Sequence, residues 1–302
     1  MLLRLNGNNF KVQSDEKMKI IECPRDAMQG LTGFIPTKRK VEYINQLLKV
    51  GFDTIDFGSF VSAKAIPQLK DTADVLDQLE LSSTKSKLLA IVANARGGED
   101  ACKHKQISYL GFPLSISETF QKRNTNKSIA EALDVVNELQ DLCAKHGKKQ
   151  VVYLSMGFGN LYGDVYDVSV VENFADILST LGVEIISLAD TIGVSQPEQI
   201  TYLFKSLTNR FPKIEFGAHL HSHPSTSIEK IEAAYNAGCQ RFDGAIKGFG
   251  GCPMAKDDLV GNMATETILA FLDSKNDSPQ LNRDEFLVAL KMADSIFVEN
   301  DD

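Results

Sequence analysis

Two histidines stand two residues apart at the end of an apolar segment, and this spacing has a chemical meaning. His219 and His221 belong to the run EFGAHLH. Because side chains alternate along a β-strand, both imidazoles should point to the same side. Two imidazoles directed into one cavity are costly unless something binds them, and a metal ion is the usual reason. The alternative is a pair of satisfied core histidines. His223 shares the alternation, but Pro224 follows it, so His223 is only a weaker alternative ligand.

A carboxylate can complete such a site. Asp26 closes the apolar run KIIECPRD, where we expect it to end a strand. One carboxylate and two imidazoles form a mixed nitrogen and oxygen set, which with open positions favours Mg²⁺, Mn²⁺ or another octahedral ion over structural zinc. Asn262, near a turn in DLVGNMATE, could add an amide oxygen, although the sequence alone does not decide this.

Three further residues carry candidate chemistry. Arg25 adjoins Asp26 and could stabilise an oxyanion, or it could form an ordinary surface ion pair. Asp190 opens DTIG after an apolar run, and could be a general base or a helix cap. Cys252 lies in GFGGCP, where three glycines give backbone freedom near a thiol; a tight turn with an incidental cysteine is the alternative.

These residues need a scaffold that gathers them, and the pattern of the chain supplies one. Short apolar, β-branched runs alternate with amphipathic segments, which is typical of parallel strands buried on both faces and separated by helices. The predicted strands are residues 19–23, 54–57, 88–93, 107–110, 151–155, 184–189, 215–220 and 241–246. The predicted helices include residues 37–50, 128–146, 167–181, 196–211 and 225–237, with a short and less certain crossover at 94–106.

Eight such repeats predict a single (β/α)₈ TIM barrel over residues 1–302, with 1–18 as a variable lead-in. A doubly wound sheet is the alternative, but no Gly-rich phosphate loop follows the first strand. Barrel active sites lie at the carboxyl ends of the strands. Polar residues gather at those predicted ends: Arg25, Asp26, Asp56, Asp190, His219, His221 and Cys252.

Composition limits the class of protein. The formal charge is −8 and the sequence pI is about 5.3, so no basic footprint for nucleic acid is visible. Five cysteines at scattered spacing do not form a disulfide framework and favour a reducing compartment. The first 20 residues lack a signal-peptide core, and no run is long enough to span a membrane. We therefore expect a cytoplasmic protein that does not bind membranes.

At the level of longer motifs, the chain resembles the 3-hydroxy-3-methylglutaryl-CoA lyases of the DRE-TIM metallolyase superfamily. The resemblance extends over nearly the whole chain after the first ~18 residues. The matching motifs are ECPRDAMQG (22–30), GSFVSAKAIPQ (58–68), SISETFQKRNTNKSIAEAL (115–133), SLADTIG (187–193), GAHLH (217–221), GFGGCP (248–253) and GNMATE (261–266).

This resemblance implies roles for the candidate residues. Asp26, His219, His221 and Asn262 would be the metal ligands, and the substrate would be an acyl-CoA thioester cleaved to acetyl-CoA and acetoacetate by retro-Claisen chemistry. Arg25 would stabilise the enolate and Cys252 would move the proton. Asp190 would help to deprotonate the tertiary hydroxyl. Asp56 stands where the family usually has Glu, and it is assigned to the catalytic set. The resemblance also implies a homodimer.

Departures from the family pattern leave the acyl group open. Asp56 is one methylene shorter than the usual Glu, SHP follows His221 where an Asp often stands, and GFGNLYGD (157–164) replaces a GCPYEG-like turn. A Claisen-condensing synthase of the same superfamily is the alternative enzyme, although such proteins usually continue H-x-H into Asn-Asp and lack GGCP. A non-catalytic barrel is a third alternative, which the intact polar set disfavours.

Overall fold

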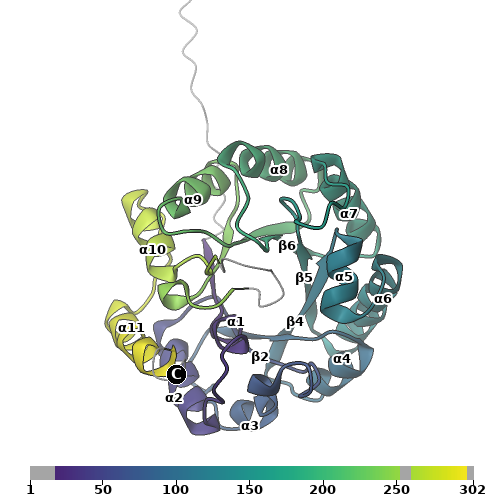
Figure 1. Ribbon diagram of the computed structural model, residues 1–302. Coiled ribbons are helices and arrows are strands. Elements are labelled where there is room, and N and C mark those ends of the chain that lie inside the picture. Colours follow the sequence, from purple (N-terminus) through teal and green to yellow (C-terminus); the bar gives the residue numbers. More distant parts are fainter. Residues whose placement is uncertain (1–17, 252–259, 298–302) are drawn as a thin grey trace, which may run out of the picture.

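The structure is a computed structural model that describes residues 18–251 and 260–297. In these residues eight parallel strands close into a barrel in chain order, with β8 paired to β1 (Figure 1). The predicted (β/α)₈ fold is thus confirmed. The strands are β1 (Lys19–Glu22), β2 (Thr54–Ser59), β3 (Lys87–Ile91), β4 (Ile107–Ser115), β5 (Lys149–Ser155), β6 (Ile185–Asp190), β7 (Glu215–Leu220) and β8 (Arg241–Gly244).

Helices surround the barrel (Figure 1). The α-helices are α1 (Pro24–Gln29), α2 (Thr37–Val50), α3 (Thr72–Leu76), α4 (Ala95–Cys102), α5 (Glu118–Thr125), α6 (Ile129–His146), α7 (Val168–Thr180), α8 (Pro197–Arg210), α9 (Ser227–Asn236), α10 (Thr265–Ser274) and α11 (Arg283–Phe297). Two 3₁₀ turns, η1 (Pro67–Leu69) and η2 (Ile246–Gly248), complete the described elements. The third crossover, uncertain from sequence, contains α4.

Strand alternation divides the core into two layers. In β3, Leu88 and Ala90 pack in the cluster between strands and helices, whereas Leu89 and Ile91 face the barrel interior. This period of two is the geometry of any β-strand, and the near-continuous apolar sequence follows from burial on both faces. The inner layer beneath the mouth is therefore a packed floor, on which polar groups at the strand ends can be held in fixed positions.

Helix α1 was not predicted, and it changes the position of Asp26. We expected Asp26 to end the first strand, but β1 stops at Glu22 and Pro24 begins a short helix. Proline is favoured at the first helical position because its missing N–H would have no partner there. Figure 1 shows α1 at the barrel mouth, inside the outer ring of helices. The helical spacing places Arg25, Asp26 and Gln29 within reach of one another.

The ring of helices closes between its first and last members. Tyr43 of α2 makes an edge-to-face contact with Phe297 of α11, with ring centroids 5.7 Å apart. Phe286 of α11 packs in the same manner on Phe52, at 6.1 Å. Such aromatic pairs bury a large apolar area in a defined geometry, so they fix the C-terminal helix against the start of the barrel. Within the described residues, no helix is long and apolar enough to cross a membrane.

Glu22 links the end of β1 to the last part of the barrel. Its carboxyl accepts a 2.8 Å hydrogen bond from the amide of Ile246, and its other oxygen lies 2.6 Å from the Thr265 hydroxyl. Burial raises the pKa of Glu22 from 4.5 to about 8. The folded protein therefore holds a proton that the unfolded chain releases between these values, and stability should fall as pH rises through that window.

Replacing Glu22 with glutamine should remove this pH dependence, because the amide mimics the protonated acid. Between pH 6 and pH 8 the unsubstituted protein should lose about 2 kcal/mol of unfolding free energy through Glu22, since one pKa unit corresponds to ~1.4 kcal/mol. Glu22→Gln should not show this loss, so its unfolding free energy should rise relative to that of the unsubstituted protein by the same amount. Urea unfolding at several pH values measures it. Glu229→Gln, at an exposed position on α9, is the control and should show no such trend. Parallel pH profiles for Glu22→Gln and the unsubstituted protein would refute this account of Glu22.

Candidate active site

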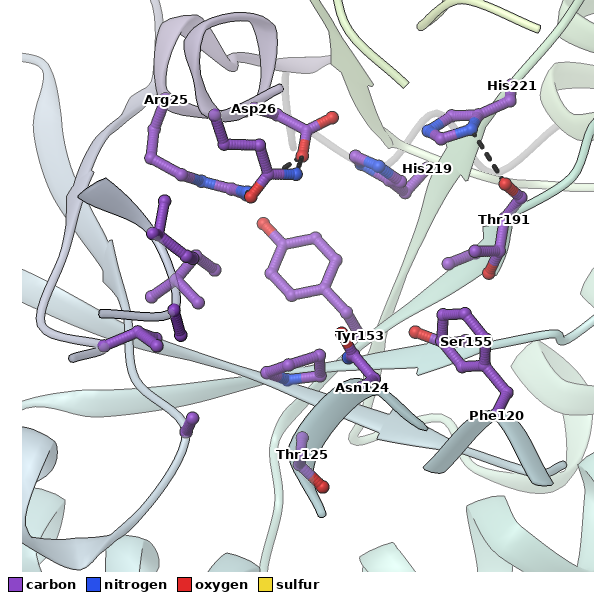
Figure 2. A pocket seen from close by; sticks show the side chains of 18 residues that line it. Arg25, Asp26, Phe120, Asn124, Thr125, Tyr153, Ser155, Thr191, His219 and His221 are labelled. Atoms are coloured by element: carbon purple, nitrogen blue, oxygen red, sulfur yellow. Dashed lines mark hydrogen bonds and ion pairs between the residues drawn. The ribbon is translucent and has the colours of Figure 1, made fainter. Parts of the chain in front are cut away.

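A cavity of about 270 Å³ opens at the carboxyl ends of the strands. Its polar groups include Arg25, Asp26, His219 and His221, which Figure 2 shows gathered along one side. Across from them lie Phe120, with Asn124 and Thr125 from the end of α5. Apolar side chains complete much of the remaining wall: Val61, Ala65, Ile66, Ile91, Ala93, Pro113 and Ala189. The cavity thus joins a charged corner to an apolar wall.

The charged corner contains the predicted cluster of ligand types. Asp26, His219 and His221 each offer an atom, and these atoms all lie within 4.8 Å of one another. The prediction that a carboxylate from the first β–α unit and two imidazoles from the seventh converge at the mouth is therefore confirmed. His221 follows β7 directly and is held by a bridge to Asn262. A single cation can be reached by all three groups.

In both histidines Nδ1 contacts an acceptor outside the cluster, which leaves Nε2 for a metal ion. His221 Nδ1 lies 3.1 Å from the carbonyl oxygen of Thr191, which can only accept, so Nδ1 carries the proton. His219 Nδ1 lies 3.2 Å from the carboxylate of Asp243. His221 Nε2 is buried and lacks a hydrogen-bond partner among the described residues. A buried acceptor without a partner is costly, so this lone pair fits a metal ion.

Burial also keeps His221 in the form that a metal requires. Burial, with the nearby charge of His219, lowers the pKa of His221 to about 4, so the ring is neutral at physiological pH. A neutral imidazole binds a metal through its free nitrogen, because the other nitrogen keeps its proton. His221 is thereby prepared as a ligand without rearrangement of its neighbours.

Asp26 is held by three donors. One carboxylate oxygen accepts from Arg25 at 2.8 Å and from Gln29 at 2.7 Å, and the other accepts from the side-chain nitrogen of Asn262 at 2.7 Å. Although burial alone raises the pKa of Asp26, the charges of Arg25 and of the two histidines hold it below its usual value. The carboxylate is therefore ionised and available to a cation.

Asn262 lies beside this cluster, but it presents its nitrogen. Its amide donates to Asp26 and, at 3.0 Å, to the carbonyl of Phe249. Hard divalent cations bind amide groups through oxygen. Asn262 would therefore have to turn its amide before acting as the predicted fourth ligand.

Arg25 is buried rather than part of a surface ion pair, the alternative that the sequence left open. Its Nε donates to both oxygens of Asp56, and one Nη contacts Asp26 and Gln29. The other Nη donates to Asp56. A guanidinium has five N–H donors. These contacts engage four of them, which leaves one N–H for a ligand in the cavity that Arg25 lines.

Asp56 is fully buried beneath Arg25 and is absent from the cavity lining. Burial raises the pKa of Asp56 to about 6, against the opposing effect of Arg25. A carboxylate paired with a guanidinium on two oxygens fixes the plane of the guanidinium. The contact with Arg25 thus orients the guanidinium, and the catalytic role of Asp56 stays a prediction from the sequence.

Asp190 is a buried carboxylate that contacts several donors. One carboxylate oxygen accepts from the amide of Val194 and the other from the amide of Ser195, each at 2.9 Å. The ammonium of Lys230 lies 3.0 Å from the second oxygen. Asp190 is buried and does not line the cavity. These contacts hold the loop after β6 and do not cap α8, whose N-cap is Gln196. The role of Asp190 as a general base stays a prediction from the sequence.

Two other predictions have simple outcomes. His223, the weaker alternative ligand, is exposed and contacts Ser225, so it stands apart from the cluster. Cys252 lies outside the described residues, and its role stays a prediction from the sequence. Cys143 and Cys239 are buried and form no disulfide within the described residues, in line with the absence of a disulfide framework expected from the cysteine spacing.

Several residues of the site were missed. Gln29 could have been found from its helical spacing to Arg25, had the helix-initiating Pro24 been recognised. Asp243 shares a strand face with Arg241 in RFDGAI, an unusual charged pair inside a barrel strand. Tyr153 lines the cavity and stacks edge-on against His219, at 5.4 Å between ring centroids. The contact of His221 with the carbonyl of Thr191 could not be predicted from the sequence, because every residue has a backbone carbonyl.

Comparisons with known proteins agree with this geometry. The model of the HMGL-like family matches residues 17–292. Hydroxymethylglutaryl-CoA lyase YngG of Bacillus subtilis is 32% identical over 268 residues, which cover 89% of each protein. The 3-hydroxy-3-isohexenylglutaryl-CoA/hydroxy-methylglutaryl-CoA lyase of Pseudomonas aeruginosa is 29% identical over 259 residues, 85% of each.

A solved structure shows the same likeness in three dimensions. An HMG-CoA lyase from Acinetobacter baumannii, in complex with coenzyme A and 3-methylmalate, superposes with a TM-score of 0.86 at 26% identity. The match covers 93% of this chain and 92% of that one. Since the family model spans most of the sequence and the lyase relatives align over nearly their whole length, this chain belongs to the HMGL-like family.

Proposed function

We propose that this protein is a divalent-metal-dependent carbon–carbon lyase that cleaves 3-hydroxy-3-methylglutaryl-CoA, or a close 3-hydroxyacyl-CoA, to acetyl-CoA and acetoacetate. The observation that carries the proposal is the convergence of Asp26, His219 and His221 beside Arg25 in one cavity. The lyase relatives support the choice of reaction, because they are about 30% identical to this chain over most of its length.

The ligand set favours Mg²⁺ or Mn²⁺. One carboxylate and two imidazoles leave several positions of an octahedral ion open for substrate oxygens, which structural zinc sites do not. Asn262 is the proposed fourth ligand after its amide turns. A cation bound here would supply positive charge that makes the tertiary hydroxyl of the substrate more acidic.

The residues of the chain then have distinct tasks. The hydroxyl at C3 gives its proton to a base, the role that the family resemblance assigns to Asp190. The C2–C3 bond then breaks, C3 becomes the ketone carbonyl carbon of acetoacetate, and the electron pair of the broken bond moves to the thioester, whose carbonyl oxygen becomes negative. Arg25 is placed to stabilise that oxygen, because it lines the cavity with one N–H not used by Asp26, Gln29 or Asp56. C2 finally takes a proton, and Cys252 is proposed to deliver it.

The apolar wall is suited to the uncharged part of an acyl-CoA. Among the described lining residues Arg25 is the one permanent cation, so the carboxylate of the substrate must rely on it or on the metal. The name of the Pseudomonas aeruginosa lyase gives two substrates, which differ in the group at C3. The proposed substrate class is thus a 3-hydroxyacyl-CoA with a free carboxylate at the end of the acyl chain away from the thioester.

A metal-removal assay tests the proposal. The purified protein should release acetoacetate from 3-hydroxy-3-methylglutaryl-CoA with Mg²⁺ or Mn²⁺, lose that activity with EDTA, and regain it when the metal is restored, because the charge at the cluster is required for bond cleavage. Acetoacetate is measured with a coupled dehydrogenase. Thiol release from acetyl-CoA only with a 2-oxo acid present would instead identify a condensing synthase, and no turnover of either kind would contradict the enzyme assignment.

A further inference from the structure

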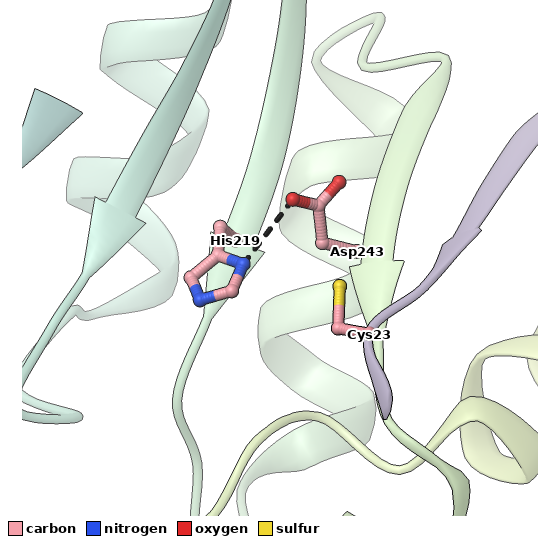
Figure 3. A group of neighbouring side chains, drawn as sticks. All are labelled: Cys23, His219 and Asp243. Carbon is pink, nitrogen blue, oxygen red and sulfur yellow. Dashed lines mark hydrogen bonds and ion pairs between the residues drawn. The ribbon is translucent and has the colours of Figure 1, made fainter. Parts of the chain in front are cut away.

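Directly beneath the metal-ligand cluster lies a buried carboxylate to which the proposed chemistry assigns no role. Asp243 of β8 is fully buried and lies next to His219 of the neighbouring strand β7, with 3.2 Å between the carboxylate and Nδ1 of the ring. Figure 3 shows this contact as a dashed line between His219 and Asp243. Because Asp243 is an acceptor on the side of the ring away from the cavity, it favours the tautomer with the proton on Nδ1.

That tautomer is the one a metal site needs. With Nδ1 donating to Asp243, the lone pair of Nε2 belongs to the face shared with Asp26 and His221. A carboxylate hydrogen-bonded to a metal-bound imidazole also fixes the ring orientation and makes the imidazole a stronger ligand. His221 achieves the same tautomer through a backbone carbonyl, which side-chain substitution cannot remove.

The positive charge of Arg241 lies next to Asp243. The guanidinium of Arg241, itself 1% exposed, lies 4.0 Å from the carboxylate oxygen that His219 does not use. That oxygen has no hydrogen-bond partner within the described residues. Arg241 is anchored at its other end by Glu215, at 3.2 Å. Asp243 accepts hydrogen bonds at one oxygen only, from His219 and from Ser187, so the adjacent fixed cation is the group that balances the charge at its other oxygen.

Cys23 offers a different interpretation of the same group. Its thiol, His219 and Asp243 also lie within 4.8 Å of one another, which is close enough for a second ion (Figure 3). The thiol is fully buried, and its sulfur lies 3.7 Å from the carbonyl of Ile21, to which it can donate. Asp243 is also already engaged with His219. We therefore favour one ion above His219 and a supporting layer below it.

We propose that Asp243, supported by Arg241, is a positioning residue that holds His219 with Nε2 directed at the metal and strengthens it as a ligand. The proposal rests on the metal site of the proposed function. It adds a residue from β8, a strand that contributes none of the three clustered ligands.

The test compares Mn²⁺ binding by the full-length protein and its Asp243→Asn variant, using isothermal titration calorimetry. The variant should keep one ion per chain, with a dissociation constant raised roughly 10- to 100-fold. At saturating Mn²⁺, kcat should recover most of its value, as expected for a residue that acts through the ligand. Ser187→Ala is the matched control: its hydroxyl lies 3.5 Å from the same carboxylate, and its loss should change the dissociation constant less than about threefold.

Substitutions at Arg241 and Cys23 distinguish two interpretations of Asp243. In one, Arg241 stabilises its charge; in the other, Asp243 binds a second metal ion with Cys23 and His219. Arg241→Met should weaken Mn²⁺ binding in the same direction, and Arg241→Lys should restore most of the affinity because it keeps the charge. Cys23→Ala should leave the affinity and the stoichiometry unchanged. Two ions per chain, with one lost in both Cys23→Ala and Asp243→Asn, would overturn the proposal, as would unchanged binding by Asp243→Asn.

A measurement on the unsubstituted protein covers the case in which Asp243→Asn does not fold. Long-range ¹⁵N–¹H NMR distinguishes the two tautomers of a neutral imidazole, and the chain has only five histidines to assign. In its neutral form, measured at a pH where the ring is no longer protonated, His219 should carry its proton on Nδ1, and a neutral ring with the proton on Nε2 would refute the proposal. If instead the unsubstituted protein binds no Mn²⁺, the proposed function fails, and the tautomer measurement still decides the role of Asp243.

Discussion

Asp26→Asn is expected to abolish measurable Mn²⁺ binding at micromolar metal and to lower kcat by ~10³-fold or more, since metal charge stabilisation is worth several kcal/mol. Asp26 is the only carboxylate of the three clustered ligands, and its ionised state depends on Arg25 and on the two histidines. An asparagine of the same size removes the negative charge that attracts the cation. It also leaves Arg25 without one of its two anionic partners.

Calorimetry and steady-state kinetics across a range of Mn²⁺ concentrations measure this effect. Asp74→Asn makes the same chemical change at an exposed position of α3 and should bind Mn²⁺ and turn over normally. Thermal unfolding of both variants controls for loss of structure. If Asp26→Asn binds Mn²⁺ with the affinity of the unsubstituted protein, Asp26 is not a ligand and the metal site must be sought elsewhere.

Arg25→Lys should lower kcat by about 10²–10³-fold while KM changes little, which is the range for losing one oxyanion donor. Lysine keeps the positive charge, but a single ammonium cannot contact Asp56, Asp26 and Gln29 and still offer a donor to the cavity. Because the charge is retained, the affinity for Mn²⁺ should change by less than about tenfold. The loss is therefore expected mainly in the chemical step.

Steady-state kinetics at saturating metal measure kcat and KM separately. Arg96→Lys, at an exposed position of α4, is the matched control and should behave as the unsubstituted protein does. A normal kcat for Arg25→Lys would show that positive charge alone is sufficient. A rise in KM at constant kcat would show that Arg25 binds the substrate without stabilising the transition state.

The sequence alone determined the barrel and the main members of the site. Each strand could be recognised from its own short apolar run, and His219 and His221 share a face because of the strand period alone. These patterns depend only on neighbouring residues, so a single sequence is enough to detect them. Carboxyl ends of parallel barrel strands meet at one mouth, and this rule placed Asp26 near the histidines without any contact being known.

Only the tertiary structure decided what each polar group does there. Asp190 is engaged by Lys230, forty positions away in α9, and Asp56 is covered by Arg25, thirty-one positions earlier. Asp243 contacts His219 because β7 and β8 pair with Ala218 beside Phe242, and this register places the next residue of each strand side by side. A carboxylate looks the same in sequence whether it faces a substrate or a buried cation. Its role depends on partners from distant segments, which only the closed barrel brings into contact.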